Sequence, residues 1–125
     1  MDNHDFSFEG LRVYQAARQL VKDVYLLVKK LPPIENFALS SQIRRAVVSV
    51  KANIAEGSGR ISPKDKAHFI DIVYGSLMET YSELETAADL DYIPEQEVKK
   101  IKQQFVDIGK MLSGLRSSFL NNDNR

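Results

Sequence analysis

The chain has 125 residues, enough for one domain with a hydrophobic core, and its 43% apolar and 27% charged residues are typical of an ordinary soluble protein. Cysteine is absent, which excludes disulfides, thiolate nucleophiles and cysteine-ligated metals. The formal net charge is zero, so a strong and diffuse attraction to nucleic acid is not expected.

The first segment, MDNHDFSFEG, is acidic and lacks the basic and then apolar pattern of a signal peptide. We expect residues 1–9 to form a flexible N-terminus. No apolar run approaches the roughly 20 residues that span a bilayer. We therefore expect a cytoplasmic protein that does not interact with membranes.

The segment 10–31 carries apolar residues at helical spacing. One row steps by three and four residues, through Tyr14, Ala17, Val21, Val24, Val28 and Leu31. A second row lies beside it, at Val13, Leu20 and Leu27. This apolar face is wider than one bundle seam needs, so we expect another subunit to cover the surplus. Pro32 and Pro33 end the helix, because proline lacks the amide proton and clashes with the preceding turn.

The segment 38–57 is predicted to form the second helix, with a polar stripe beside its apolar row. The apolar row runs through Ile43, Val47, Val50 and Ile54. The polar stripe consists of Gln42, Arg45, Ser49, Asn53 and Glu56, with Arg44 beside it. The following Gly57-Ser58-Gly59 is interpreted as a helix stop. A P-loop would need a preceding strand and a Gly-Lys-Ser/Thr ending, although Arg60 could still contact a phosphate.

The third predicted helix, 63–90, begins with a capping signal, in which Ser62 caps, Pro63 suits the first position and Asp65 can return a hydrogen bond. Its apolar row is Ile70, Val73, Leu77, Thr80, Leu84 and Ala87. Beside this row lies a second polar row that includes Ser76, Glu79 and Glu83. We expect the two polar rows to face each other, with arginine opposite glutamate, within a subunit or between subunits. Contact with a ligand or nucleic acid is the alternative for these residues.

The segment 94–120 has the clearest period. A heptad seam runs through Val98, Ile101, Phe105, Ile108, Leu112, Leu115 and Phe119. The preceding Asp91-Tyr92-Ile93-Pro94 is a break, and no strand-like alternation of useful length appears. The prediction is an all-α, up-down-up-down antiparallel four-helix bundle over residues 10–120, followed by a disordered tail at 121–125.

The sequence offers little support for catalysis. Glu79 and Glu83 lie one helical turn apart, but a di-iron bundle needs Glu-x-x-His on two helices, and Asp65-x-x-His68 is only a near match. No serine has a histidine placed to activate it. We therefore expect no catalytic residue, no metal and no cofactor, and predict that the protein is not an enzyme.

Three stretches together resemble one known family. They are FEGLRVYQAARQL at 8–20, QIRRAVVSVKANIAEGSGR at 42–60 and GSLMETYSELETAADLDYI at 75–93. They resemble the bacterial four-helix-bundle proteins encoded in intervening sequences of 23S ribosomal RNA genes, over roughly residues 8–119. Ala38 and Asp91 stand where that family usually has glycine. Asp91 is a tolerable substitute, because aspartate enters the left-handed region more readily than most residues.

The resemblance implies a bundle that assembles as a ring, with a homopentamer favoured, and no established enzymatic activity. Relatives in diversity-generating retroelements bind nucleic acid and reverse transcriptase, but they are more basic. In a ring, the basic side chains of the first helix would repeat once per subunit and form a multivalent surface; they are Arg12, Arg18, Lys22 and Lys29. We therefore predict a non-catalytic oligomeric binding module for structured RNA or a ribonucleoprotein. The alternative is a protein-only scaffold or adaptor that does not bind nucleic acid.

Overall fold

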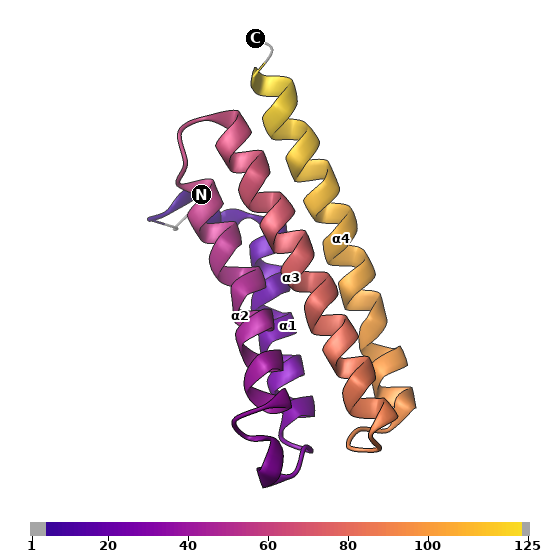
Figure 1. Ribbon diagram of the computed structural model, residues 1–125. Helices are drawn as coiled ribbons and strands as arrows, with labels where there is room; N and C mark the ends of the chain where they lie inside the picture. The colour runs from indigo at the N-terminus through magenta and orange to yellow at the C-terminus, as the bar shows by residue number, and fades with distance from the viewer. Residues whose placement is uncertain (1–4, 124–125) are drawn as a thin grey trace.

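The chain folds into four long helices that run alternately down and up the molecule (Figure 1). The computed structural model describes residues 5–123. In chain order its elements are the short 3-10 helix η1 (Ser7–Gly10), α1 (Arg12–Val28), the 3-10 helix η2 (Pro33–Glu35), α2 (Leu39–Ser58), α3 (Pro63–Asp89) and α4 (Glu95–Asp123). No strand occurs among these residues. The predicted all-α, up-down-up-down antiparallel four-helix bundle is confirmed.

The first element differs from the sequence prediction. The flexible segment was predicted to reach residue 9, but Ser7–Gly10 form η1. The Glu9 carboxylate accepts the backbone amide of Phe6 at 2.9 Å, and the ring of Phe8 packs edge-on against Tyr14 with 4.8 Å between centroids. These contacts fix η1 against the bundle, and α1 begins only at Arg12. Residues 1–4 lie outside the described residues.

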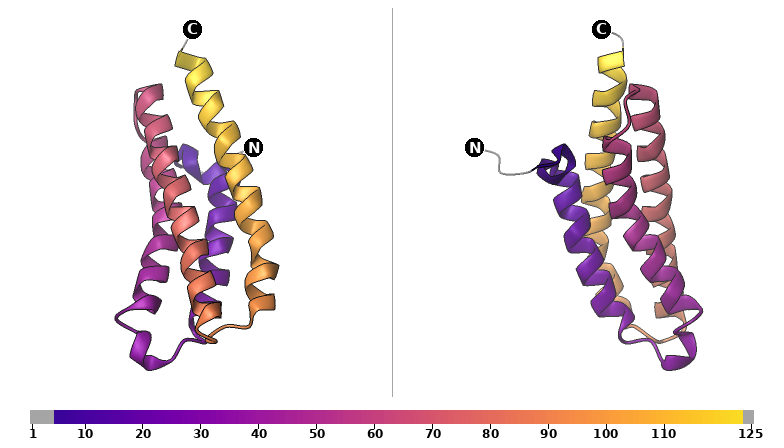
Figure 2. Two further views of the ribbon diagram at one scale, coloured as in Figure 1. Left: turned by 45° about the vertical axis from the view of Figure 1, so that its right-hand side comes forward. Right: turned by 90° about the vertical axis from the view of Figure 1, so that its left-hand side faces the viewer.

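Helix α4 also extends farther than predicted. It runs to Asp123, into the segment 121–125 that was predicted to be a disordered tail. The reason is local, because no proline or glycine follows Gly114 to end the helix. Figure 2 shows the last turns of α4 extending beyond the other three helices. Residues 124–125 lie outside the described residues.

The signals predicted for two turns are confirmed in part: Ser62, Pro63 and Asp91 take the expected places, whereas no hydrogen bond returns from the Asp65 carboxylate to Ser62 among the described residues. The Ser62 hydroxyl accepts the backbone amide of Asp65 at 3.2 Å, and Pro63 occupies the first turn of α3. Asp91 has a φ of 63° and is the one non-glycine residue with positive φ in the described part of the chain. It therefore takes the left-handed conformation that an aspartate was expected to tolerate at this position.

The hydrophobic core lies along the bundle axis and is built from one row of each helix. Its members are Val13, Ala17, Leu20, Val24 and Val28 of α1, Ile43, Val47, Val50 and Ile54 of α2, Ile70, Val73, Leu77, Leu84 and Ala87 of α3, and Val98, Ile101, Phe105, Ile108 and Leu112 of α4. The buried hydroxyl of Thr80 donates to the Ser76 carbonyl oxygen at 2.7 Å, so this polar group is satisfied within α3.

The wide apolar face predicted for α1 is used inside the subunit. Val13 and Leu20 of the second row are 4% and 0% exposed, and Leu27 is partly buried. These rows are covered because α1 packs against both α2 and α4. The expectation that another subunit covers these two rows is therefore wrong, and the exposed apolar residues of α1, Tyr25 and Leu26, lie outside both rows.

Polar contacts tie together the two helix connections at the lower end of the bundle (Figure 1). The Tyr92 hydroxyl donates to Glu35 Oε2 at 2.9 Å, and Glu35 Oε1 accepts the backbone amide of Leu39 at 3.2 Å. An ion pair between Lys30 and Glu97 joins the same two regions. The connection between α1 and α2 is thus fixed to the turn between α3 and α4.

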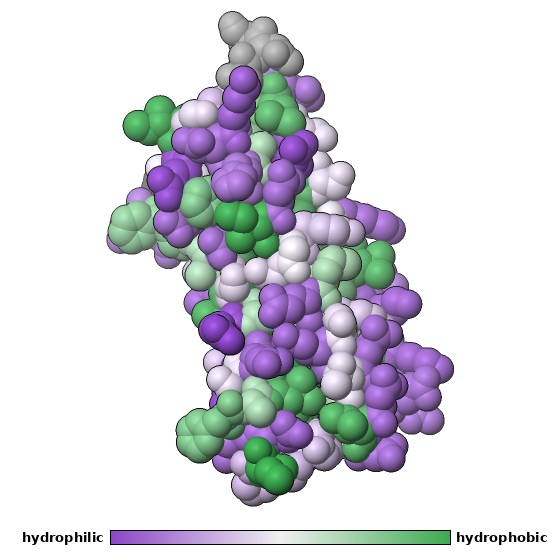
Figure 3. All heavy atoms as spheres, in the orientation of Figure 1, coloured by the Kyte–Doolittle hydropathy of each residue, from purple (hydrophilic) through white to green (hydrophobic). Residues whose placement is uncertain are grey.

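The surface mixes hydrophilic side chains with separate apolar patches (Figure 3). One patch lies at the lower end, at the connection between α1 and α2, where Ile34 and Phe37 are 83% and 99% exposed. No described helix is both long and apolar enough to cross a bilayer.

Candidate functional site

Short polar side chains join α2 to α3 along the predicted stripe. The hydroxyl groups of Ser49 and Ser76 share a hydrogen bond of 2.9 Å. The Asn53 amide donates to the Ser49 hydroxyl at 2.8 Å and to the Ser49 carbonyl oxygen at 2.9 Å. Near the end of α2 the two helices approach closely, because a Cβ added to Gly57 would lie 2.5 Å from the Cβ of Phe69. This part of the stripe joins helices within one subunit.

The charged members of the stripe behave differently. Arg45 and Glu79 are exposed, and no ion pair in the described part of the chain links Arg45 to Glu79 or Glu83. The expected arginine–glutamate pair is therefore not formed within the subunit. The seam is closed by two short serines, so the longer side chains extend from its edge into solvent.

The other polar residues of α2 make local contacts. Arg44 donates to the Asn36 carbonyl oxygen at 3.2 Å, which fixes the start of the helix to the preceding connection. Glu56 pairs with Arg60 one turn later at 3.0 Å, and Gln42 is exposed. Gly57 and Ser58 lie inside α2 rather than after it, so the predicted helix stop falls at Gly59.

Among the described residues, Glu83 is the one side chain with a buried polar atom that lacks a hydrogen-bond partner. It is half-buried, and its Oε2 atom is buried without a hydrogen-bond partner. The pKa of Glu83 is raised to about 7, first by burial and then by the neighbouring Glu79 carboxylate, against the opposing effect of the Arg45 guanidinium. No group of three or more histidine, aspartate or glutamate residues that could hold a metal ion occurs among the described residues.

The raised pKa of Glu83 predicts that the free energy of unfolding falls as the pH rises from about 4.5 to about 7. In this pH window the folded protein keeps a proton on Glu83 that the unfolded chain releases. The contribution of Glu83 to the free energy of unfolding is therefore complete below the pKa that Glu83 has in the unfolded chain. It is lost as the pH rises through the pKa that Glu83 has in the folded protein. Glu83→Gln keeps the neutral form. It should reduce the stability difference between pH 5 and pH 7.5 by about 1–2 kcal/mol, roughly half the full linkage value, because solvent reaches part of the side chain. Urea unfolding at both pH values measures this, and identical pH dependence in both proteins would contradict it.

The basic residues predicted for the first helix are all exposed, and Lys29 directly follows Val28, the last residue of α1. At 3.6 residues per turn, Arg18, Lys22 and Lys29 fall within an arc of about 40°, whereas Arg12 points about 100° away from them. These three cations face away from the buried row of α1. Arg60 lies instead in the connection between α2 and α3, with its guanidinium carbon 4.6 Å from the centroid of the Phe69 ring. The structure thus brings three of the five predicted contacts together.

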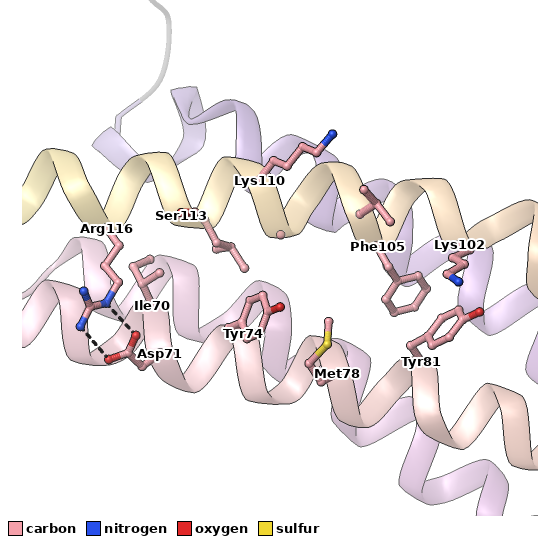
Figure 4. Close-up of a pocket in the computed structure, with 13 residues that line it drawn as sticks. Ile70, Asp71, Tyr74, Met78, Tyr81, Lys102, Phe105, Lys110, Ser113 and Arg116 are labelled. Carbon is pink, nitrogen blue, oxygen red and sulfur yellow. Dashed lines mark hydrogen bonds and ion pairs between the residues drawn. The ribbon is translucent and has the colours of Figure 1, made fainter.

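The main cavity lies between α3 and α4 and was not predicted. It is a groove of about 670 Å³ whose floor includes Ile70, Phe105 and Leu112 (Figure 4). Three large apolar side chains along it are exposed, with Tyr74 at 49%, Met78 at 41% and Val106 at 39%. We refer to it as the α3–α4 groove.

The ends of the α3–α4 groove are fixed by polar and aromatic contacts. Arg116 of α4 binds both carboxylate oxygens of Asp71 of α3, at 2.8 and 3.2 Å (Figure 4). At the other end Tyr81 packs edge-on against Phe105 with 5.2 Å between centroids, and the Lys102 ammonium lies 5.8 Å from the Tyr81 centroid. The groove is therefore a preformed apolar surface with cations at its edge.

A sequence signal for the α3–α4 groove exists but is weak. On α3, Tyr74, Met78 and Tyr81 step by four and three residues, one position away from the core row. On α4, Val106 and Gly109 follow the core residues Phe105 and Ile108 in the same way. Such second rows show a wide apolar face, but they do not show which face another helix of the same chain will cover.

Comparison with known proteins agrees with this architecture. The family model described as 23S rRNA-intervening sequence protein matches residues 9–114. A solved structure, a protein of unknown function from the S23 ribosomal protein family of Bacteroides thetaiotaomicron, is similar with a TM-score of 0.75 and 26% identity. The match covers 83% of this chain and 97% of that one. No curated protein matches. The chain belongs to the 23S rRNA-intervening sequence protein family.

Proposed function

We propose that this protein is a non-catalytic oligomeric binding module. Copies of the chain join through the α3–α4 groove, with five copies favoured, and the assembly presents the basic face of α1 to structured RNA or a ribonucleoprotein. The observation that carries the proposal is the groove, an open and largely apolar cavity of about 670 Å³ that exposes Tyr74, Met78 and Val106 on a small bundle.

A second copy of the chain is a suitable occupant of the groove because of charge as well as apolar character. Lys102 and Lys110 lie at the groove, next to its exposed apolar side chains. On the other side of α3, Val48 and Ile72 are 40% and 38% exposed, and the exposed Glu79 carboxylate lies on that side. Groove and opposite face are complementary, and contacts between two different faces of one chain can close into a ring. The number five rests on the family resemblance.

The basic face of α1 supports RNA as the partner. Arg18, Lys22 and Lys29 are exposed along one side of α1, over a length of about 16 Å. Because the chain has no net charge, binding must depend on such local clusters rather than on a general attraction. A ring would repeat the cluster once per subunit and raise the apparent affinity for a long RNA. The association of the family with 23S rRNA genes is the second support.

A titration against fragments of 23S rRNA at low and physiological salt tests the proposal. Affinity should fall as salt rises, by about 0.7–0.9 log units per log unit of salt for each phosphate contact, because bound counterions are released. Replacing Arg18, Lys22 and Lys29 by glutamine should flatten this slope by about 0.7–0.9 for each phosphate that the variant no longer neutralises.

The matched control replaces three exposed lysines outside α1 by glutamine, namely Lys64, Lys99 and Lys100. It has the same net charge as the α1 variant and should keep the wild-type slope. Light scattering on each variant verifies that assembly is unchanged. If the intact oligomer fails to bind RNA at low salt, the RNA part of the proposal is wrong and the protein-only scaffold stands in its place.

A further inference from the structure

We infer that the pocket where η1 meets α1 and α2 binds an unpaired base of single-stranded RNA. This inference rests on the proposed RNA binding and names the contact that would read unpaired nucleotides. The pocket has a volume of about 300 Å³, and its walls include Phe6, Phe8, Tyr14, Arg18 and Lys51. That volume is at the lower end of the range for small-molecule sites, about 300–1,000 Å³.

Three aromatic rings form a continuous row in this pocket. The Phe6 and Phe8 rings are nearly parallel, with 7° between planes and 6.0 Å between centroids, and Phe8 meets Tyr14 edge-on at 4.8 Å. Phe6, at the outer end of the row, is 63% exposed. Exposing a large ring beside a packed aromatic pair leaves apolar surface in water, and a flat aromatic ligand stacked on Phe6 would cover it.

The backbone that carries the Phe6 ring is held in place before any ligand arrives. The backbone amide of Phe6 donates to Glu9 Oε1 at 2.9 Å, and the Gln15 side chain donates to the Glu9 carbonyl oxygen at 2.7 Å. η1 is thereby bound to α1 on the side of the pocket. A stacking surface that is already ordered loses less conformational entropy on binding.

Two cations lie beside the aromatic row. The Lys51 ammonium lies 5.9 Å from the Tyr14 ring centroid, and Arg18 donates to the Gln15 amide oxygen at 3.4 Å. Within residues 5–123 neither cation forms an ion pair with a carboxylate. The Glu9 carboxylate of the pocket already accepts the Phe6 amide. The pocket therefore contains two cationic side chains and one carboxylate among the described residues.

This combination selects a single-stranded nucleotide over other ligands. Surfaces that bind single strands pair aromatic side chains, which stack on bases, with cations that contact the backbone phosphates. A neutral apolar ligand would cover Arg18 and Lys51 without neutralising them, at a desolvation cost. Inside a duplex each base face is stacked on its neighbour and is not free to stack on Phe6. Arg18 also begins the basic face of α1, so a strand leaving the pocket meets Lys22 and Lys29 next.

Two phenylalanines provide a matched test with a short oligouridylate of about eight nucleotides as probe. Phe6→Ala should weaken binding about 5- to 150-fold, as expected for the loss of one base–aromatic stack. Phe37→Ala removes another exposed ring, at the opposite end of the bundle, and should leave binding unchanged. Circular dichroism verifies that both variants are folded. Equal effects of the two substitutions would overturn the inference.

A tryptophan at the same positions gives a direct readout, because the chain contains no tryptophan. Stacking in Phe6→Trp should quench the indole fluorescence when oligouridylate is added, whereas Phe37→Trp should show no change. Duplex RNA of the same length should not quench Phe6→Trp, and equal quenching by duplex would overturn the assignment to unpaired bases.

If rRNA fragments bind but Phe6 variants behave as wild type, this inference alone fails. If no RNA binds at low salt, the proposed RNA function fails with it.

Discussion

Met78→Asp and Val106→Asp are each expected to reduce the particle in solution to a single 14.2 kDa chain. Both side chains line the α3–α4 groove, where an assembled neighbour would bury them. A carboxylate placed there would be taken out of water without a partner, which costs several kcal/mol per subunit contact and shifts the equilibrium toward the free chain. Because Met78 and Val106 are 41% and 39% exposed in the subunit, the fold itself should tolerate the change.

Light scattering at micromolar concentration measures this effect, with circular dichroism as the test of folding. Phe37→Asp is the matched control, since Phe37 is 99% exposed and lies outside the groove. It introduces the same charge and should leave the mass of the assembly unchanged. A wild-type protein that is already monomeric would contradict assembly altogether. Unchanged mass in both groove variants would show that copies meet through another surface.

Gly57→Ala is expected to destabilise the folded protein by about 1–3 kcal/mol, although alanine is the better helix former. The added Cβ would lie 2.5 Å from the Cβ of Phe69, closer than two such carbon atoms can approach. Phe69 cannot relieve the clash by changing its side-chain rotamer, because its Cβ is fixed to the backbone of α3. The two helices must therefore separate, and the serine and asparagine hydrogen bonds of the seam weaken with them.

Gly75→Ala is the control for Gly57→Ala. Gly75 lies on the exposed side of α3, and an added Cβ meets no atom within 4 Å. Here the substitution should stabilise the protein by about 0.5–1 kcal/mol, through helix propensity and a less flexible unfolded chain. Urea unfolding of both variants gives the comparison. Stabilisation of similar size at both positions would show that α2 and α3 are not in close contact at Gly57.

Most of the fold was predictable because the core rows of the helices follow a simple period. The rows of α2, α3 and α4 identified from the sequence are the rows that the structure buries, and Ser62 and Asp91 adopt the roles expected of them. The ends of the helices were less predictable. η1 forms through a side-chain hydrogen bond to Glu9 and the contact of Phe8 with Tyr14, and neither interaction appears in a periodic pattern.

The candidate site was less predictable, because it depends on which helix covers which face. The wide apolar face of α1 and the second row of α3 look alike in sequence, yet Leu20 is covered by the bundle and Tyr74 is exposed. Likewise, Arg45 of α2 and Glu79 of α3 each lie in a polar row beside a core row, which favours a buried ion pair between the helices. In the structure, Ser49 and Ser76 occupy the space between the helices instead. Periodicity identifies such rows but does not give the rotation of each helix about its axis.

The order of the helices along the chain also affects how the protein is synthesised. Consecutive helices are neighbours in the bundle, and connections of this kind give a low contact order, which is associated with folding in microseconds to milliseconds. Translation adds only about 5–20 residues per second, so α1 and α2 have time to pair while the ribosome is still making the rest. The α3–α4 groove, however, needs the last two helices. A nascent chain therefore has no complete groove, and self-association through it must wait until α4 has emerged.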